Sequence, residues 1–339
     1  MHFLITGHTG FKGAWLTLLL RERGHKISGL SLDPKENSLF QRAEIGRFLE
    51  RDLRCDIRDS RKLEKCFKEI QPDVVIHLAA QSLVLESYRN PGLTFETNVI
   101  GTLNVINASK VIADLKAQLI VTTDKVYKNQ ENVSGYVEED PLGGKDPYSA
   151  SKAMADIGAQ SLLSSFSNPP SAIARAGNVI GGGDSGVDRL IPDLVNSYRL
   201  GLVPKLRAPD YIRPWQHVLD CLNGYLVLVE ALNRGMASGE WNFGPAIGQS
   251  KSVADVADIA GATWGVKTNW EISSDSLQKD KESRVLILDS SKARQNLGWS
   301  EKLSFEESVE WTVRWFKSVS EGSSPLQETL ADIKRFESR

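Results

Sequence analysis

Three glycines near the start of the chain constrain its fold most strongly. The stretch T-G-H-T-G-F-K-G places Gly7, Gly10 and Gly13 directly between a strand-like segment, 2–6, and a helix-like segment, 12–23. In such a position one glycine permits a tight turn, one lets the backbone approach a pyrophosphate, and one lets the helix pack against the strand. The free N–H groups and the positive dipole end of the helix favour a phosphate there. The loop therefore predicts a dinucleotide site within an α/β fold.

The first half of the chain alternates short apolar segments with segments of helical periodicity. The apolar segments D-V-V-I-H-L and Q-L-I-V-T do not alternate cleanly with polar residues, which is typical of strands covered on both faces. Repeated strand–helix units predict a doubly wound parallel sheet of the Rossmann type, with right-handed crossovers. Besides the first pair, we expect strands over 26–30, 73–78 and 118–122 and helices over 60–70, 93–113 and 147–166.

The sequence pattern changes after about residue 176, where Gly- and Pro-bearing loops separate shorter elements. We expect helices over 219–233, 252–265 and 304–318, and the last two open with the spacing of a capping box. A chain of 339 residues exceeds the usual size of one domain, so two closely joined domains are expected. They are a Rossmann domain of residues 1–176 plus about 216–245, and a smaller mixed α/β substrate domain of about 177–215 plus 246–320, followed by a peripheral tail, 321–339.

The composition excludes several functional classes. A net charge of −2, with Lys and Arg spread along the chain, gives no basic surface for nucleic acid. Three cysteines and five histidines without ligand spacing argue against a disulfide framework and against a metal site. The chain begins directly with a strand-like segment, and no stretch approaches the roughly 20 apolar residues that span a bilayer. We therefore expect a cytoplasmic protein with no membrane, nucleic-acid or metal partner.

Tyr148 and Lys152 stand four residues apart in P-Y-S-A-S-K, where Pro147 suits the first turn of a helix. This spacing places both side chains on one helical face. A tyrosine with a pKa of about 10 is a poor base at neutral pH, whereas a neighbouring ammonium stabilises its phenolate. Such a pair can take a proton from a hydroxyl while nicotinamide oxidises the attached carbon. Y-x-x-x-K also occurs on ordinary surface helices, so the prediction depends on its combination with the glycine loop.

Three further candidate catalytic residues, Thr123, Asp124 and Lys125, follow the expected strand 118–122. They should therefore lie at the carboxyl edge of the sheet, where ligands bind in doubly wound folds. An acid at that edge is not needed for the oxidation of a hydroxyl alone.

These motifs resemble the extended branch of the short-chain dehydrogenase/reductase superfamily and, within it, the CDP-glucose 4,6-dehydratases. The dTDP-glucose and GDP-mannose dehydratases carry Glu after the catalytic Asp, whereas the CDP-glucose enzymes carry Lys, as this chain does at Lys125. The resemblance runs from Met1 to about Trp315 and is carried by G-H-T-G-F-K-G-x-W, S-L-D-P, H-L-A-A-Q-S-L-V, D-P-L-G-G-K-D-P-Y-S-A-S-K, A-R-A-G-N-V-I-G-G-G-D, D-R-L-I-P-D and R-P-W-Q-H-V.

The resemblance implies a hydro-lyase that converts CDP-D-glucose to CDP-4-dehydro-6-deoxy-D-glucose, for deoxysugar and surface-polysaccharide (O-antigen) synthesis. It implies that Tyr148 and NAD oxidise carbon 4 with the hydroxyl held by Thr123, and that Asp124 protonates the departing hydroxyl of carbon 6 before the hydride returns there. Lys125 either removes the carbon 5 proton in its neutral form or steadies charge while another group removes it.

Two other functions remain as alternatives at this stage. One is another nucleotide-sugar 4,6-dehydratase or 4-epimerase of the same superfamily. The other is a non-catalytic NAD-binding regulator, which should have lost Tyr148 or Lys152.

The glycine loop and the resemblance together imply NAD as cofactor. Asp33 follows Gly13 by 20 residues, where a carboxylate binds the adenosine ribose, although a D-P turn residue is the alternative. No Arg stands beside Asp33 in the sequence, so NAD is favoured over NADP. The residues expected to bind NAD are Gly7, Thr9, Gly10, Phe11, Lys12, Gly13, Asp33, Asp56, Ile57, Leu78, Ala79, Ala80, Asn98, Tyr148 and Lys152.

The nucleotide sugar is expected to contact residues from both halves of the chain. Arg213 suits bidentate contact with a diphosphate. For Asn178 a turn residue is the alternative, and for Arg189 a solvated arginine. Trp215 and His217 are expected to pack rather than to react. The full set expected to bind the nucleotide sugar is Gln81, Thr123, Asn178, Arg189 and Arg213.

The helices expected over 93–113 and 147–166 are apolar around much of their circumference. One face of each should cover the sheet, and the other invites a two-fold partner. By pattern and by resemblance we expect a homodimer held by a four-helix contact.

Overall fold

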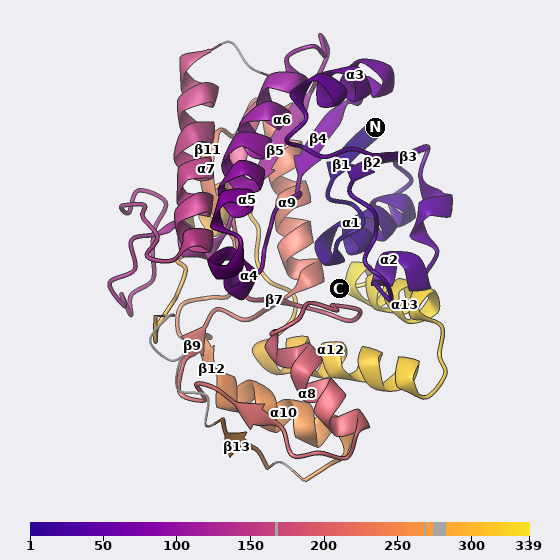
Figure 1. The fold of residues 1–339 in the computed structure, drawn as a ribbon, viewed down its shortest axis with the longest axis vertical. Coiled ribbons are helices and arrows are strands. Elements are labelled where there is room, and N and C mark those ends of the chain that lie inside the picture. The colour runs from indigo at the N-terminus through magenta and orange to yellow at the C-terminus, as the bar shows by residue number, and fades with distance from the viewer. Residues whose placement is uncertain (167–168, 268, 274–282) are drawn as a thin grey trace.

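A parallel sheet forms the centre of the fold (Figure 1). The computed structural model describes residues 1–166, 169–267, 269–273 and 283–339. The sheet has seven strands in the order β11-β6-β5-β4-β1-β2-β3, and every neighbouring pair is parallel, which confirms the predicted doubly wound α/β fold. The strands are β1 (His2–Thr6), β2 (Lys26–Ser31), β3 (Arg51–Arg54), β4 (Val74–His77), β5 (Ala117–Val121), β6 (Ser171–Arg175) and β11 (Gly239–Asn242).

The sequence predicts four of these strands, β1, β2, β4 and β5, to within one residue at each end. The other three, β3, which ends just before Asp56, β6 and β11, are not among the strands expected above. The sequence of β6, S-A-I-A-R, has alanine where buried strands usually carry larger β-branched residues, and β11, G-E-W-N, is a short edge strand with two polar residues. Both become strands because each pairs with a neighbour that is already in the sheet.

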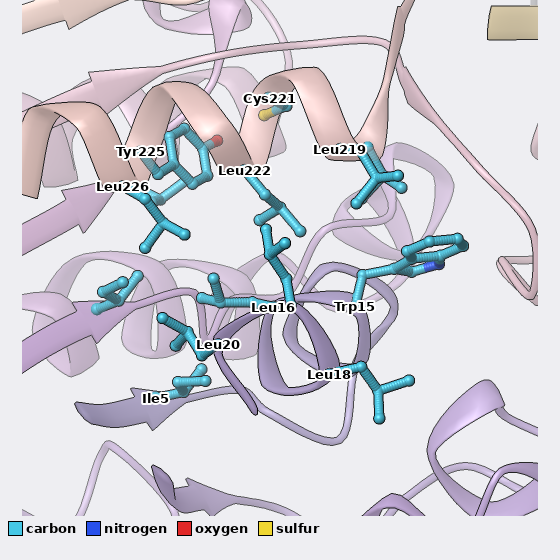
Figure 2. Packing of buried hydrophobic residues seen from close by; sticks show 14 of the residues in the cluster. Ile5, Trp15, Leu16, Leu18, Leu20, Leu219, Cys221, Leu222, Tyr225 and Leu226 are labelled. Carbon is cyan, nitrogen blue, oxygen red and sulfur yellow. The ribbon is translucent and has the colours of Figure 1, made fainter. Parts of the chain in front are cut away.

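Helices cover both faces of the sheet, as the crossovers require. α1 and α9 lie against one face and share the largest apolar cluster, whereas α3, α6 and α7 lie against the other. Figure 2 shows Trp15 and Leu16 of α1 facing Leu219 and Leu222 of α9. All four side chains are fully buried, and a buried leucine contributes roughly 1.5–3 kcal/mol of stabilisation. These helices are α1 (Phe11–Glu22), α3 (Ser60–Ile70), α6 (Gly101–Ser109), α7 (Pro147–Ser165) and α9 (Val218–Asn233).

The helix expected over 93–113 is interrupted in the structure. α5 (Pro91–Phe95) passes through a π-helical turn, η2 (Glu96–Ile100), into α6, which ends at Ser109. π turns inside helices are frequent at functional sites, because they move one side chain out of the helical register. The turn contains Asn98, whose side chain is fully buried.

The smaller layer of the molecule lies below the sheet in Figure 1 and consists of helices and two-stranded pairs. The predicted capping boxes are present at Ser252 with Asp255 and at Ser304 with Glu307. The position of the domain boundaries stays a prediction. The elements are α8 (Leu190–Arg199), α10 (Val253–Trp264), α12 (Phe305–Ser320), β7 (Val179–Ile180) paired with β10 (Gln216–His217), β9 (Ile212–Arg213) paired with β12 (Lys251–Ser252), and β8 (Lys205–Leu206) paired with β13 (Glu271–Ile272).

The last segment is packed more deeply than the expected peripheral tail. It forms α13 (Pro325–Glu337), whose Leu326, Ile333 and Phe336 are buried in the same cluster as α1 and α9. The sequence prediction missed this because the three apolar residues are spaced among charged ones. In the described ranges, no helix has the length and apolar character needed to cross a bilayer. The remaining elements are α2 (Leu39–Arg42), α4 (Val84–Arg89), α11 (Ser291–Leu297) and the 3₁₀ turns η1 (Ile45–Phe48) and η3 (Asp124–Val126).

Candidate active site

The glycine loop has the close backbone packing that a phosphate site needs. Gly7 has a φ of +78°, and a Cβ there would lie 2.7 Å from the backbone nitrogen of Ala79. A Cβ at Gly13 would overlap the carbonyl oxygen of Gly7, so α1 begins directly against the loop. Gly10 is the N-cap of α1 and has no side chain to cap it, so the first N–H groups of the helix are available to an anion. The loop therefore fits a dinucleotide pyrophosphate.

Asp33 lies where the ribose of a dinucleotide is expected, and its side chain is 89% exposed. The expectation that no arginine stands beside it was wrong: Arg54 Nε donates to Asp33 Oδ1 at 3.1 Å. The parallel pairing of β2 with β3 places Ser31 opposite Arg54, which the sequence alone does not reveal. Arg54 also donates to both carboxylate oxygens of Asp52, so two carboxylates share its charge.

The other residues expected around NAD lie along the same edge of the sheet. Thr9 Oγ1 is 2.7 Å from Ser31 Oγ, which fixes the loop to the end of β2. Asp56 accepts hydrogen bonds from Arg58, and these lower the pKa of its carboxyl. Ile57 is buried against Gly101, where a Cβ would overlap its side chain. Phe11, Leu78, Ala79 and Ala80 are partly buried around the loop and the end of β4.

Asn98 and Gln81 are joined to each other rather than left free for a ligand. Asn98 Oδ1 accepts from the backbone N–H of Gln81 at 2.8 Å, and its amide nitrogen donates to the Gln81 carbonyl and to Ser151 Oγ. The Gln81 side chain donates to the hydroxyl of Thr94 and to the carbonyl of Leu83, from whose N–H it also accepts. The π turn thus connects the loop after β4 to α7, which carries the candidate catalytic pair.

Tyr148 and Lys152 lie in the first turns of α7, and Asp146 caps this helix by accepting from the N–H of Ser149 at 3.0 Å. Burial raises the pKa of Tyr148 to about 12, and the hydrogen bond with the Thr123 hydroxyl opposes this rise. Burial lowers the pKa of Lys152 to about 8. Lys152 Nζ donates to the carbonyl of Val121 at 3.1 Å, so its charge lies against the end of β5.

Asp124 follows β5 and is 1% exposed. Thr123 Oγ1 donates to its Oδ1 at 2.9 Å, and its Oδ2 has no hydrogen-bond partner among the described residues. Burial raises the pKa of the Asp124 carboxyl, against the opposing charge of Lys125 and the smaller effects of Arg213 and Lys12. The acid form of Asp124 therefore persists to a higher pH than that of an ordinary aspartate, and Oδ2 is available to a ligand.

Lys12 belongs to the expected cofactor set, but its side chain leaves the loop toward α9. Its Nζ donates to the hydroxyl of Tyr225 at 3.1 Å, and Tyr225 is fully buried. Tyr225 is not among the predicted site residues, because nothing in the sequence distinguishes it from an ordinary apolar position of a buried helix. Only the packing of α1 against α9 brings it to the site.

The residues expected on the substrate side have partners of different kinds. Arg213 is 5% exposed, and its guanidinium contacts the backbone carbonyls of Ile212 and Arg284 and the ring of Tyr211. Arg189 donates to both carboxylate oxygens of Asp184, at 2.9 and 2.8 Å. Arg189 NH2 also lies 3.3 Å from Ser82 Oγ, and its charge opposes the rise of the Tyr148 pKa. Arg189 is thus not a freely solvated side chain.

Asn178 has a φ of +47°, a left-handed conformation in which asparagine is common. Its carbonyl accepts from the N–H of Gln216 at 3.3 Å. Both observations fit the alternative in which Asn178 is a turn residue. Trp215 and His217 pack as predicted: Trp215 is 6% exposed, and His217 is fully buried between the rings of Trp15 and Trp311. In the described part of the chain, no three His, Cys, Asp or Glu side chains are grouped to hold a metal ion.

Comparisons with known proteins find similar sequences over nearly the whole chain. The family model described as GDP-mannose 4,6 dehydratase matches residues 4–312. A CDP-glucose 4,6-dehydratase of Salmonella typhimurium is 41% identical over 333 residues, which cover 95% of this chain and 92% of that protein. A UDP-glucose 4-epimerase of Halalkalibacterium halodurans is 29% identical and covers 96% of this chain and 98% of its own.

Among solved structures, a dTDP-glucose 4,6-dehydratase of Bacillus anthracis in complex with NAD superposes with a TM-score of 0.81. It is 25% identical in sequence, and the match covers 96% of this chain and 99% of that one.

Proposed function

The chain belongs to the GDP-mannose 4,6-dehydratase family, and on this premise we propose that it converts CDP-D-glucose to CDP-4-dehydro-6-deoxy-D-glucose. The observation that carries the proposal is the buried Asp124 beside Thr123 and Tyr148. A 4-epimerization needs one base for a hydroxyl, whereas loss of water from carbon 6 also needs an acid, and burial favours the acid form of Asp124. The choice of CDP-glucose rests on the relative that is 41% identical and on Lys125 after Asp124.

We propose NAD as the resident cofactor of this reaction. The loop from Gly7 to Gly13 and the N-terminus of α1 would hold the pyrophosphate, and Asp33 would bind the adenosine ribose. Tyr148 and Lys152 would lie at the nicotinamide end of the cofactor, because their side chains contact Thr123 and Val121 at the carboxyl end of β5. When bound, NAD supplies the oxidant for carbon 4 of the sugar and returns the same electrons at carbon 6.

The protein's own groups move the protons of this reaction. Tyr148, hydrogen-bonded to Thr123, accepts the proton of the carbon 4 hydroxyl. The pKa of Tyr148 is raised to about 12, chiefly by burial, so a cation must favour its phenolate. Arg189, the N-cap of α8, already opposes this rise with its charge, and Lys152 lies one helical turn from Tyr148 in α7. Asp124 donates its proton to the carbon 6 hydroxyl, which leaves as water. The carbon 5 proton lost in the same elimination passes to water, and a proton returns to carbon 5 when the hydride enters at carbon 6.

Lys125 is proposed to steady charge rather than to act as the carbon 5 base. It lies on the turn η3 next to Asp124, and its positive charge is the largest influence that opposes the rise of the Asp124 pKa. That charge favours the carboxylate left after Asp124 has given up its proton, and so assists the proton transfer to the leaving hydroxyl.

We propose a homodimer built on α5, α6 and α7. Leu93 of α5, Ile100 of the turn η2 that leads into α6, and Met154 and Ile157 of α7 are 41–51% exposed, although each is a large apolar side chain. Residues 154 and 157 are three positions apart and share one face of α7. Two copies paired through this surface would cover it with a four-helix contact. Sedimentation of the protein as a monomer at micromolar concentration would contradict the dimer.

The proposals for the cell compartment and the pathway depend on CDP-D-glucose being the substrate. We propose a cytoplasmic enzyme that supplies deoxysugars for surface polysaccharide, including O-antigen. The three free cysteines, Cys55, Cys66 and Cys221, are all buried, which agrees with a reducing compartment but does not require one.

The decisive experiment is a substrate comparison with the purified protein and no added reduced nicotinamide. CDP-glucose, dTDP-glucose, GDP-mannose and UDP-glucose are each incubated, and the 4-keto product is measured by its absorbance in base. We expect product from CDP-glucose at a kcat/KM well above that for the other three. Intact binding of NAD with no keto product from CDP-glucose would refute the proposal. A change of UDP-glucose into its 4-epimer without a keto product would establish the epimerase alternative.

A further inference from the structure

We infer that Gly177 is a positioning residue for Asp124, and that the acid step depends on the absence of a side chain at position 177. The inference rests on the proposed function only for the identity of the step. Its basis is geometric: a Cβ built on Gly177 would overlap the Cγ and both carboxylate oxygens of Asp124. Asp124 therefore lies directly across the α-carbon of Gly177.

The sheet register explains why these two residues meet. β5 and β6 are parallel, and Val121 pairs with Ala174 at their carboxyl ends. The N–H of Thr122 continues the ladder by donating to the carbonyl of Ala174 at 2.9 Å. Both segments then leave the sheet, and Asp124 begins the turn η3, but they stay side by side, so position 124 lies beside position 177. A side chain at 177 would therefore occupy the space into which the acid projects from this turn.

The backbone around Gly177 is held by hydrogen bonds to other segments of the chain. Gln216 Nε2 donates to the carbonyl of Gly177 at 3.3 Å, and the N–H of Gln216 donates to the carbonyl of Asn178. The N–H of Phe243 donates to the carbonyl of Arg175 at 2.9 Å. Arg175 is itself fixed by a fully buried ion pair with Asp156. The carbonyl groups of residues 175, 177 and 178 are thus all bonded to groups outside the segment of Asp124, and these bonds oppose a shift of the backbone at Gly177.

Asp124 is the partner that would move. Among the described residues its carboxyl accepts one hydrogen bond, from Thr123, and Oδ2 accepts none. Gly177 is not in the left-handed region of φ, so alanine there meets no backbone penalty of its own. The variant Gly177→Ala should therefore fold and should turn the carboxyl of Asp124 away from its place beside Thr123.

The test compares the wild type with Gly177→Ala, Asp124→Ala and the double variant, each with NAD bound. We expect Gly177→Ala to lower kcat for dehydration about 100-fold or more, the effect of losing a general acid, with little change in KM. Oxidation at carbon 4 needs Tyr148 but not Asp124. The absorbance of reduced nicotinamide should therefore still appear after CDP-glucose is added and should persist. In the Asp124→Ala background the second substitution should have almost no further effect on kcat.

Two measurements separate positioning from general damage. The affinity of the Gly177→Ala protein for NAD, by calorimetry, and its unfolding midpoint should stay near those of the wild type. The matched control is Gly92→Ala, because a Cβ there meets no described atom within 4 Å. Wild-type kcat in Gly177→Ala, or effects of the two substitutions that multiply in the double variant, would overturn the inference.

A crystal structure of Gly177→Ala decides the geometry independently of any substrate. A turned Asp124 carboxyl supports the inference, and an unmoved carboxyl beside a shifted backbone overturns it. If the wild type does not dehydrate CDP-glucose, the proposed function fails, and this structure still gives the answer for Gly177.

Discussion

Asp124 owes its proposed role to three neighbours that act in different ways. The end of β5 buries the carboxyl, which favours its acid form, whereas Lys125 favours the carboxylate that remains after proton transfer. Thr123 holds one carboxylate oxygen, so the other can face a ligand. Burial without the cation would give an acid too weak to donate, and the cation without burial would give a carboxylate with no proton to give.

We predict that Asp124→Asn lowers kcat for dehydration about 10²–10⁴-fold, because an amide cannot donate the proton that leaves with water. The pKa of Asp124 is raised, so the active acid form persists as pH rises and is lost only above that pKa. The wild-type kcat should therefore fall on the alkaline side through this ionisation. The residual activity of Asp124→Asn should lack that fall, as measured by kcat against pH.

The matched control for this prediction is Asp114→Asn, a change at an exposed aspartate outside the site. It should leave both kcat and the pH profile unchanged. An alkaline fall of equal size in wild type and Asp124→Asn would assign that ionisation to another group.

Residues close together in the sequence were the ones that could be predicted. Gly7, Gly10 and Gly13 lie in one loop, and Tyr148 and Lys152 lie one helical turn apart, so their relation depends only on local geometry. Neighbours across the sheet or between helices could not be predicted in this way. Asp33 with Arg54, Asp124 with Gly177, and Lys12 with Tyr225 meet because of strand register or helix packing.

At the scale of elements, the pairing of β2 with β3 bears on the choice of cofactor. It brings Arg54 beside Asp33. An arginine near this position can accommodate the 2′-phosphate of NADP. Asp52 already binds the guanidinium through both oxygens, so Asp33 is the second carboxylate on Arg54. In the sequence, Asp33 alone favours NAD over NADP. In the structure, this preference depends on how far Asp33 and Asp52 neutralise the positive charge of Arg54.

We predict that Asp33→Ala lowers the affinity for NAD about tenfold, the loss of one charged hydrogen bond to ribose, and raises the affinity for NADP. Calorimetry on protein freed of nucleotide measures both. The gain for NADP should disappear in Asp33→Ala combined with Arg54→Ala, because Arg54 supplies the attraction. Equal losses for NAD and NADP in the single variant would show that Arg54 stays neutralised by Asp52.

The contact of α7 with β6 is a second relation between elements. Asp156 of α7 and Arg175 of β6 form an ion pair at 2.8 Å with side chains 0% and 1% exposed. We predict that Asp156→Ala lowers the free energy of unfolding by about 3–5 kcal/mol, because Arg175 is left charged and buried. Urea unfolding at one fixed protein concentration measures it. The control, Glu64→Ala, breaks an exposed pair with Lys68 and should change stability by about 0.5 kcal/mol or less.

At the scale of the whole molecule, α9 connects the sheet to the C-terminal helices. Its middle packs on α1, and its first turn carries Asp220, which accepts from the backbone N–H groups of Lys302 and Leu303 at 2.7 and 3.3 Å. These two residues lead into α12, and α13 returns from there to the core of the first half. The buried carboxyl of Asp220 thus holds the segment before α12, through which the C-terminal helices return to the core around α1 and α9.

This position predicts a pH dependence of stability that is specific to Asp220. Burial raises its pKa to about 7, well above the ordinary value of about 3.9. The folded protein therefore keeps a proton that the unfolded chain releases, so the stabilisation is lost as pH rises from about 4 to about 7. Asp220→Asn retains a carbonyl acceptor but stays neutral. Its free energy of unfolding minus that of the wild type should rise across this window and then level off.

The measurement is urea unfolding of both proteins at a series of pH values. The buried carboxyl of Asp332, whose pKa burial also raises to about 7, contributes equally to both proteins and cancels in the difference. A difference that stays flat from pH 4 to 7 would mean that Asp220 is ionised in the folded protein throughout this range. The two N–H groups of Lys302 and Leu303 would then outweigh its burial, and α9 would hold the C-terminal helices through a charged bond.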